Sequence, residues 1–220
     1  AYDVDDVRSR RRRVALSPPD WEPGRLRSGF IGNLPGLGVS PDVCAVFAEA
    51  MDALALELGE RSDADFSGYD FARMRRAALL IMEAELAVEL EADLDDGASP
   101  VSPRLRDMLG FARSKSAVTY AAADRMLDQA VLTARHLFEQ VDVLVLPTVS
   151  HGPYRIGETE RAGDADLCSF ASLAGCPAVS LPMGILENGM PIGLQLVGAP
   201  GSDLLLLELA EVCASRLDAT

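Results

Sequence analysis

Few residues of this chain could perform covalent chemistry, and the most suggestive group is Ser114-Lys115-Ser116. An uncharged lysine beside a serine hydroxyl could activate that hydroxyl as a nucleophile for acyl transfer. Adjacent residues on a helix, however, point in diverging directions. We therefore expect this triplet to form an exposed helix start and not a catalytic pair.

The two histidines, His136 and His151, raise the question of a different hydrolase triad or of a metal site. No Gly-x-Ser-x-Gly nucleophile elbow lies near either of them. The cysteines show no Cys-x-x-Cys spacing, so two histidines have no partners for a structural zinc site. We predict reduced thiols, no metal and no cofactor.

The elements that would position such residues alternate between helical and strand patterns, which indicates an α/β fold with a mixed sheet sandwiched between helices. The apolar run DVLVLP, stopped by a proline, is typical of a buried, parallel strand, and PAVSLP has the same pattern. Asn188-Gly189 predicts a hairpin turn. The expected helices span about 40–59, 69–94, 116–139 and 203–217, and the expected strands lie within 26–32, 142–147, 177–182 and 191–198.

Apolar spacing predicts which side of each helix faces the core. Ser40 as N-cap, Pro41 in the first turn and Gly59 as the stop delimit the first helix. The expected inward residues are Val43, Phe47, Ala50, Leu54 and Leu58 in the first helix, Phe71, Met74, Ala78, Met82, Leu86 and Leu90 in the second, and Tyr120, Ala123, Leu127, Ala130, Ala134 and Leu137 in the third. Arg73, Arg75 and Arg76 are expected on a solvated face, and residues 97–100 should end the second helix.

The length of 220 residues and the hydrophobic content of 49% suit one domain or a piece of one. We expect a connecting segment with one strand at 1–39, a helical region at 40–140, and the sheet core with the closing helix at 141–220.

The net charge of −14 argues against nucleic acid as a partner, because phosphate binding needs clustered cations. The basic run at 8–13 has acidic neighbours and is interpreted as a solvated connection. No apolar run is long enough to span a bilayer, and the first residues are too charged for a signal peptide. These features predict a cytoplasmic protein without membrane contact.

Four segments in register resemble the C-terminal region of the amidase-signature family: DVLVLPT at 142–148, YRIGE at 154–158, SLAGCPAVSLPMG at 172–184 and MPIGLQLVG at 190–198. Their glycines, among them Gly175, Gly184 and Gly193, should permit close backbone approach or unusual dihedral angles. Gln195 lies among apolar residues, and we expect mainly backbone groups to satisfy its side chain. The resemblance makes the chain the C-terminal part of a single amidase domain, with an incomplete sheet.

The resemblance implies amide hydrolysis by a serine nucleophile that a second serine and a lysine activate. The family carries these residues in an upstream Gly/Ser-rich loop and before it, and this chain has neither that loop nor a lysine other than Lys115. No catalytic residue is therefore assigned here. Ser172, where the family commonly has asparagine, leaves the substrate unnamed.

Ligand contacts in α/β proteins collect in irregular chain after a strand's carboxyl end, and the loop after Pro147 borders the acyl pocket in the resembled family. We predict that substrate-shaping residues lie in this loop and before the SLAG turn. They are Thr148, Ser150, His151, Tyr154, Arg155, Asp166 and Ser169.

Three functions remain open from the sequence. The first is an amidase acting on a small-molecule amide, and the second is a transamidation subunit resembling the glutaminase component of the aminoacyl-tRNA amidotransferase. The third is a non-catalytic amidase remnant that acts as an interaction module. An incomplete sheet would leave a strand edge exposed, which favours self-association, as a homodimer or larger species, or pairing with a missing N-terminal half.

Overall fold

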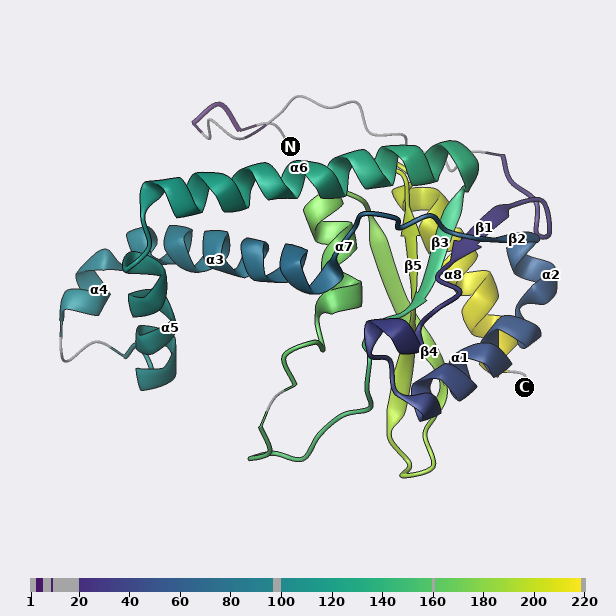
Figure 1. Cartoon of the computed structure of the whole chain (residues 1–220). Coiled ribbons are helices and arrows are strands. Elements are labelled where there is room, and N and C mark those ends of the chain that lie inside the picture. Colours follow the sequence, from purple (N-terminus) through teal and green to yellow (C-terminus); the bar gives the residue numbers. More distant parts are fainter. Residues whose placement is uncertain (1–2, 6–8, 10–19, 97–99, 160, 219–220) are drawn as a thin grey trace.

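The computed structural model describes residues 3–5, 9, 20–96, 100–159 and 161–218, and Figure 1 shows a sheet flanked by helices. Most of the basic run at 8–13 and the expected helix stop at 97–99 lie outside the described residues. The strands are β1 (Arg27–Phe30), β2 (Glu60–Asp63), β3 (Val143–Pro147), β4 (Ala178–Ile185) and β5 (Pro191–Gly198). The helices are η1 (Pro35–Leu37), α1 (Pro41–Ala53), α2 (Ala55–Leu58), α3 (Phe71–Glu89), α4 (Glu91–Asp95), α5 (Pro103–Arg113), α6 (Ala117–Gln140), α7 (Asp166–Ala174) and α8 (Asp203–Asp218).

The sheet is mixed, with the strand order β2-β1-β3-β5-β4 within the described part of the chain. β1 runs parallel to β2 and β3, whereas β5 is antiparallel to both β3 and β4. All residues of the central strand β3 are buried, so the expectation of a buried strand with a parallel neighbour is confirmed. The carboxyl ends of β1, β2 and β3 consequently meet at one edge of the sheet.

Strand β4 differs from the expectation of a fully buried strand. Its buried side chains Leu181 and Met183 alternate with exposed Ser180 and Pro182, which is typical of an antiparallel strand with one covered face. No other described strand pairs with its outer edge. The Asn188-Gly189 hairpin is confirmed, and Gly189 adopts φ +80° in the turn.

Two helical layers cover the sheet, as the sequence predicted. Helices α1 and α8 pack against β4 and β5, while α6 and α7 pack on each other and, with α3, form the second layer. α3 and α6 extend side by side beyond the sheet, where α5 joins them (Figure 1). No helix among the described residues is long and apolar enough to cross a membrane.

The first helical segment follows the expected face, since every residue predicted to face the core is buried. Ser40 precedes Pro41, but its hydroxyl donates to Asp42 and does not cap the helix. The helix breaks at Leu54 and ends at Gly59, which has φ +67°. A Cβ at Gly59 would overlap the carbonyl oxygen of Leu26, so this stop requires glycine.

The prediction of the buried face of α3 is wrong for the C-terminal half of this helix. Met82 is 65% exposed and Leu86 is 39% exposed, while Ile81 and Ala87 are buried instead. The cause is that α3 packs against both α6 and α5 after leaving the sheet, which rotates its buried stripe. Arg73 and Arg76 are exposed as expected, but Arg75 is not, because it binds Asp166 of α7.

The third helix, α6, begins after Ser116, whose hydroxyl accepts the Thr119 N–H at 3.1 Å. Of its predicted inward residues, Ala123, Ala130, Ala134 and Leu137 are buried, whereas Tyr120 and Leu127 are half-buried. The sequence did not predict β2, α5 or α7. Strand β2 has the polar sequence ERSD and an exposed edge position, so no apolar pattern marks it.

Candidate active site

The carboxyl edge of β1 and β3 carries the loop in which most of the predicted substrate residues lie. Thr148 follows β3 directly, and its N–H donates to the Gly193 carbonyl of β5 at 2.8 Å. The Ser40 N–H at the start of α1 donates to the Ser150 carbonyl at 2.9 Å. The first residues of this loop are therefore held by a strand on one side and a helix start on the other.

A cavity of about 370 Å³ opens beside this loop and is called the Thr148 pocket below. Its polar lining includes Thr148, His151, Tyr154, Asp164 and Ser180, with the backbone of Gly193 as part of its floor. The volume falls within the range of small-molecule sites, and its place at the carboxyl edge agrees with the general location of ligand sites in α/β proteins.

One wall of the pocket is a pair of hydroxyl groups. Thr148 Oγ1 and Ser180 Oγ lie 2.6 Å apart, which is a hydrogen bond in which either atom could be the donor. A Cβ at Gly193 would lie 2.7 Å from Thr148 Oγ1 and 2.8 Å from Ser180 Oγ. The predicted need for close backbone approach at Gly193 is thus met, because only glycine leaves room for this hydroxyl pair.

A second wall holds His151 and Asp164, whose Nδ1 and Oδ1 atoms are 3.6 Å apart. Both atoms are shielded from solvent and have no hydrogen-bond partner among the described residues. Their side chains are 29% and 27% exposed, so each has one part inside the protein and another part accessible.

Gln195 lies directly across from Ser180 on the neighbouring strand, on the same face of the sheet. The residue is only 4% exposed, and its Nε2 has no partner among the described atoms. The expected satisfaction by backbone groups is therefore not found for this donor. A buried amide donor without an acceptor is costly.

The structure brings together three of the seven predicted residues, since Thr148, His151 and Tyr154 line the Thr148 pocket. Ser150 is buried behind the loop, with its hydroxyl unpartnered among the described residues. Arg155 is exposed, and its N–H donates to Glu158 at 3.1 Å.

The remaining two predicted residues lie at the start of α7. Asp166 forms an ion pair with Arg75 of α3, with Oδ1 and Nε 2.5 Å apart, and Ser169 donates its hydroxyl to the Asp166 carbonyl at 3.0 Å. Sequence reasoning missed Asp164 and Ser180. Ser180 carried a signal as the only polar residue in PAVSLP, whereas nothing distinguished Asp164 from its acidic neighbour.

Lys115 lies at the junction of α5 and α6, and its Nζ sits 3.7 Å above the Phe111 ring. It does not line the Thr148 pocket. Within the described residues, no group of three or more His, Cys, Asp or Glu side chains could hold a metal ion. The Thr148 pocket therefore contains hydroxyl groups and a histidine, and among the described residues no serine-lysine pair lies in it.

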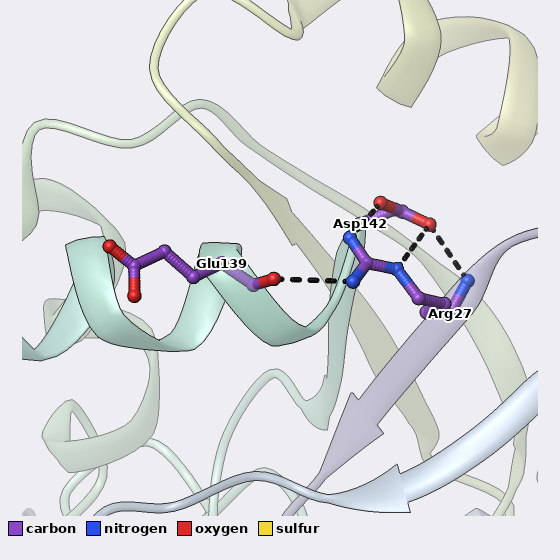
Figure 2. A network of polar contacts seen from close by, with 3 residues as sticks. All are labelled: Arg27, Glu139 and Asp142. Carbon is purple, nitrogen blue, oxygen red and sulfur yellow. Dashed lines mark hydrogen bonds and ion pairs between the residues drawn. The ribbon is translucent and has the colours of Figure 1, made fainter.

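At the amino ends of β1 and β3, Arg27, Glu139 and Asp142 form a network of polar contacts, which Figure 2 shows. The Arg27 guanidinium donates to both Asp142 oxygens, at 2.7 and 3.3 Å, and to the Glu139 carbonyl at 3.2 Å. The Arg27 N–H also donates to Asp142 at 2.9 Å. These hydrogen bonds lower the pKa of Asp142 and join β1 to the end of α6 and the start of β3. This contact is structural and lies away from the pocket.

The mixed sheet between helical layers, with a pocket at the carboxyl edge of the parallel strands, defines an α/β fold. Solved structures with the same fold are known. The 6-aminohexanoate cyclic dimer hydrolase superimposes with a TM-score of 0.69 at 27% identity, over 90% of this chain and 46% of that chain.

The sequence model of the family described as Amidase matches residues 21–207, and the chain belongs to this family. A fatty acid amide hydrolase of Medicago truncatula is 32% identical over 64% of this chain and 25% of its own length. A glutamyl-tRNA(Gln) amidotransferase component of Symbiobacterium thermophilum is 36% identical over 41% of this chain and 20% of its own length. The chain thus spans less than half of these relatives, and the expected family and fold class are confirmed.

Proposed function

We propose that this chain forms the C-terminal part of an amidase that hydrolyses a small-molecule amide, with the Thr148 pocket shaping the substrate. The observation that carries the proposal is that Thr148, Ser180 and His151 line one cavity at the carboxyl edge of a chain of the amidase family. Thr148, His151 and Tyr154 contact the substrate. Asp166 has a structural role, because its carboxylate is bound by Arg75.

We further propose that the serine nucleophile, its bridging serine and the lysine lie in polypeptide outside these 220 residues. Support comes from the pocket, which contains hydroxyl groups but no lysine, and from the hydrolase structure, of which this chain covers 46%. The printed chain alone is accordingly expected to have no amidase activity. The exposed sheet face at Ser180 and Pro182 is where a missing half would pack.

The test is to add an affinity tag to the 3′ end of the chromosomal gene and to purify the polypeptide that the cells make. Its mass is measured together with ammonia release from a panel of aliphatic and aryl amides. We expect turnover, and we expect Tyr154→Ala to change the ratio of kcat/KM between aliphatic and aryl amides. The printed chain and its Lys115→Ala variant serve as controls.

Absence of turnover with every amide would overturn the hydrolase proposal. Turnover by the printed chain that is lost in Lys115→Ala would instead make that lysine catalytic and would overturn the placement of the lysine outside the chain.

The likeness to an amidotransferase component over 98 residues favours a second candidate, in which the protein releases ammonia from glutamine for a partner enzyme. Copurification of the tagged protein with a partner that raises glutamine hydrolysis would support it. A third candidate, a non-catalytic remnant acting as an interaction module, predicts a tagged polypeptide of the printed length that copurifies with a protein partner and has no turnover.

A further inference from the structure

His151 and Asp164 form a polar pair that the serine-lysine chemistry does not use. Buried polar atoms without hydrogen-bond partners destabilise a folded protein. Nδ1 of His151 and Oδ1 of Asp164 are both buried, both unpartnered among the described residues, and only 3.6 Å apart. A slightly shorter distance between these two atoms would satisfy both at once, and catalytic hydrogen bonds are often long before a ligand binds.

The other carboxylate that interacts with His151 is already engaged. Asp42 accepts hydrogen bonds from the Ser40 hydroxyl and from the Val43 N–H, both on Oδ1. Among the described residues, Asp164 is the carboxylate whose oxygen lies 3.6 Å from Nδ1, and it is the one placed to orient the imidazole. A carboxylate can only accept, so its partner Nδ1 must carry the hydrogen.

We propose that Asp164 is a positioning residue that holds the hydrogen of neutral His151 on Nδ1, so that Nε2 accepts a hydrogen bond from an N–H group of the ligand in the Thr148 pocket. Nδ1 is shielded, so the accessible 29% of the side chain belongs to the rest of the ring, where Nε2 is the remaining polar atom. The choice of tautomer by the partner of the other ring nitrogen is general for histidine.

The hydroxyl pair in the same pocket complements this acceptor. Thr148 and Ser180 share one hydroxyl hydrogen in their mutual bond, which leaves the second hydroxyl hydrogen free to be donated. This hydroxyl hydrogen and the Nε2 acceptor, in a cavity of about 370 Å³, match the carbonyl and N–H of a carboxamide. A carboxylate of the same size would instead face the Nε2 lone pair. The choice of a carboxamide as the ligand rests on the proposed function. The inferred tautomer of His151 does not depend on it.

The tautomer is tested by nitrogen NMR on the uniformly ¹⁵N-labelled chain at about pH 9, where imidazole is neutral. The chain carries Ile185→Lys, a substitution at an exposed position that disfavours pairing through the β4 edge. The chain has two histidines, so a His136→Gln variant assigns the signals. We expect His151 to carry its hydrogen on Nδ1. We expect Asp164→Asn to move it to Nε2, because the asparagine amide donates to Nδ1. Exposed Asp128→Asn is the matched control and should change nothing.

Ligand recognition is tested by titrating propionamide and propionate while following the His151 signals. Propionamide should bind better than propionate, and Asp164→Asn should weaken propionamide binding about fivefold, the effect of one hydrogen bond.

If His151 carries its hydrogen on Nε2 while Asp164 is unchanged, Asp164 does not position the imidazole. The proposed function would not be affected by this result. Equal propionamide binding by the unaltered chain and Asp164→Asn would show a structural role only. Failure of propionamide to bind, with the hydrogen on Nδ1, would overturn the amide pocket itself.

Discussion

Arg27 holds Asp142 by three hydrogen bonds, two from its side chain and one from its N–H, and so fixes the start of β1 against the start of β3. The side chains are 45% and 35% exposed, so solvent screens the interaction and its contribution to stability is small. The contact nevertheless defines the register of the parallel pair, because Ser28 lies beside Val143 one residue further on.

Asp142→Asn should lower the free energy of unfolding at pH 7 by roughly 0.5–1 kcal/mol. Folding lowers the pKa of Asp142, so the contribution of this carboxylate is present above about pH 3.9 and is lost as the pH falls through the folded-state value. Urea unfolding of both proteins should show the difference shrinking below about pH 4. A difference that stays constant down to about pH 3 would contradict the assigned cause.

Arg75 and Asp166 form a better shielded pair, with side chains 16% and 13% exposed. Asp166→Ala would leave the charge of Arg75 unpaired and shielded from water. The substitution should therefore lower the free energy of unfolding by about 2–4 kcal/mol. Arg76→Ala, on the exposed side of the same helix, is the control and should cost less than about 0.5 kcal/mol. A strong effect on substrate KM with unchanged stability would instead restore the substrate role predicted from sequence.

Gly193→Ala should push apart the hydroxyl pair of Thr148 and Ser180, since the added Cβ would lie 2.7 and 2.8 Å from their oxygens. We expect a loss of about 1–2 kcal/mol in chemical denaturation. Gly110→Ala is the matched control, because nothing lies within 4 Å of its Cβ position in α5. That control should stabilise the helix by up to about 1 kcal/mol. Equal effects of the two substitutions would show that Gly193 has no packing role.

Tyr69 is 7% exposed, and its hydroxyl has no partner among the described atoms, while burial raises its pKa. Its ring packs against Phe71 and Phe170, with centroids 4.8 and 5.3 Å away. Tyr69→Phe keeps these contacts and removes the unpaired hydroxyl, so it should be neutral or stabilising by about 1 kcal/mol. A clear decrease in Tm, compared with Tyr154→Phe, would reveal a hydrogen-bond partner for Tyr69.

The printed chain should self-associate at micromolar concentration through the outer edge of β4. This edge pairs with no described strand, and Ile185 near its end is 69% exposed. Ile185→Lys should shift the sedimentation profile toward monomer, because an inserted charge disfavours strand addition. A monodisperse monomer that unfolds cooperatively before any substitution would contradict the prediction. The unaltered chain could then be used in the NMR tests.

Local signals in the sequence determined the elements that have strong apolar periodicity or glycine and proline boundaries. The buried faces of α1 and α6, the buried strand β3 and the hairpin at Asn188-Gly189 follow from spacing within a few residues. The four ordered motifs likewise determined the family, because each constrains backbone positions of the shared fold.

Tertiary structure alone decided which polar residues meet. Asp166 and Arg75 are 91 residues apart, and only the packing of α7 on α3 turns an expected substrate residue and an expected solvated arginine into an ion pair. Met82 and Leu86 became exposed because α3 leaves the sheet and packs between two helices, which its own periodicity does not encode. Thr148, Ser180, His151 and Asp164 share a pocket because a loop folds over the carboxyl edge of the sheet, and such convergence depends on long-range contacts that no local pattern specifies.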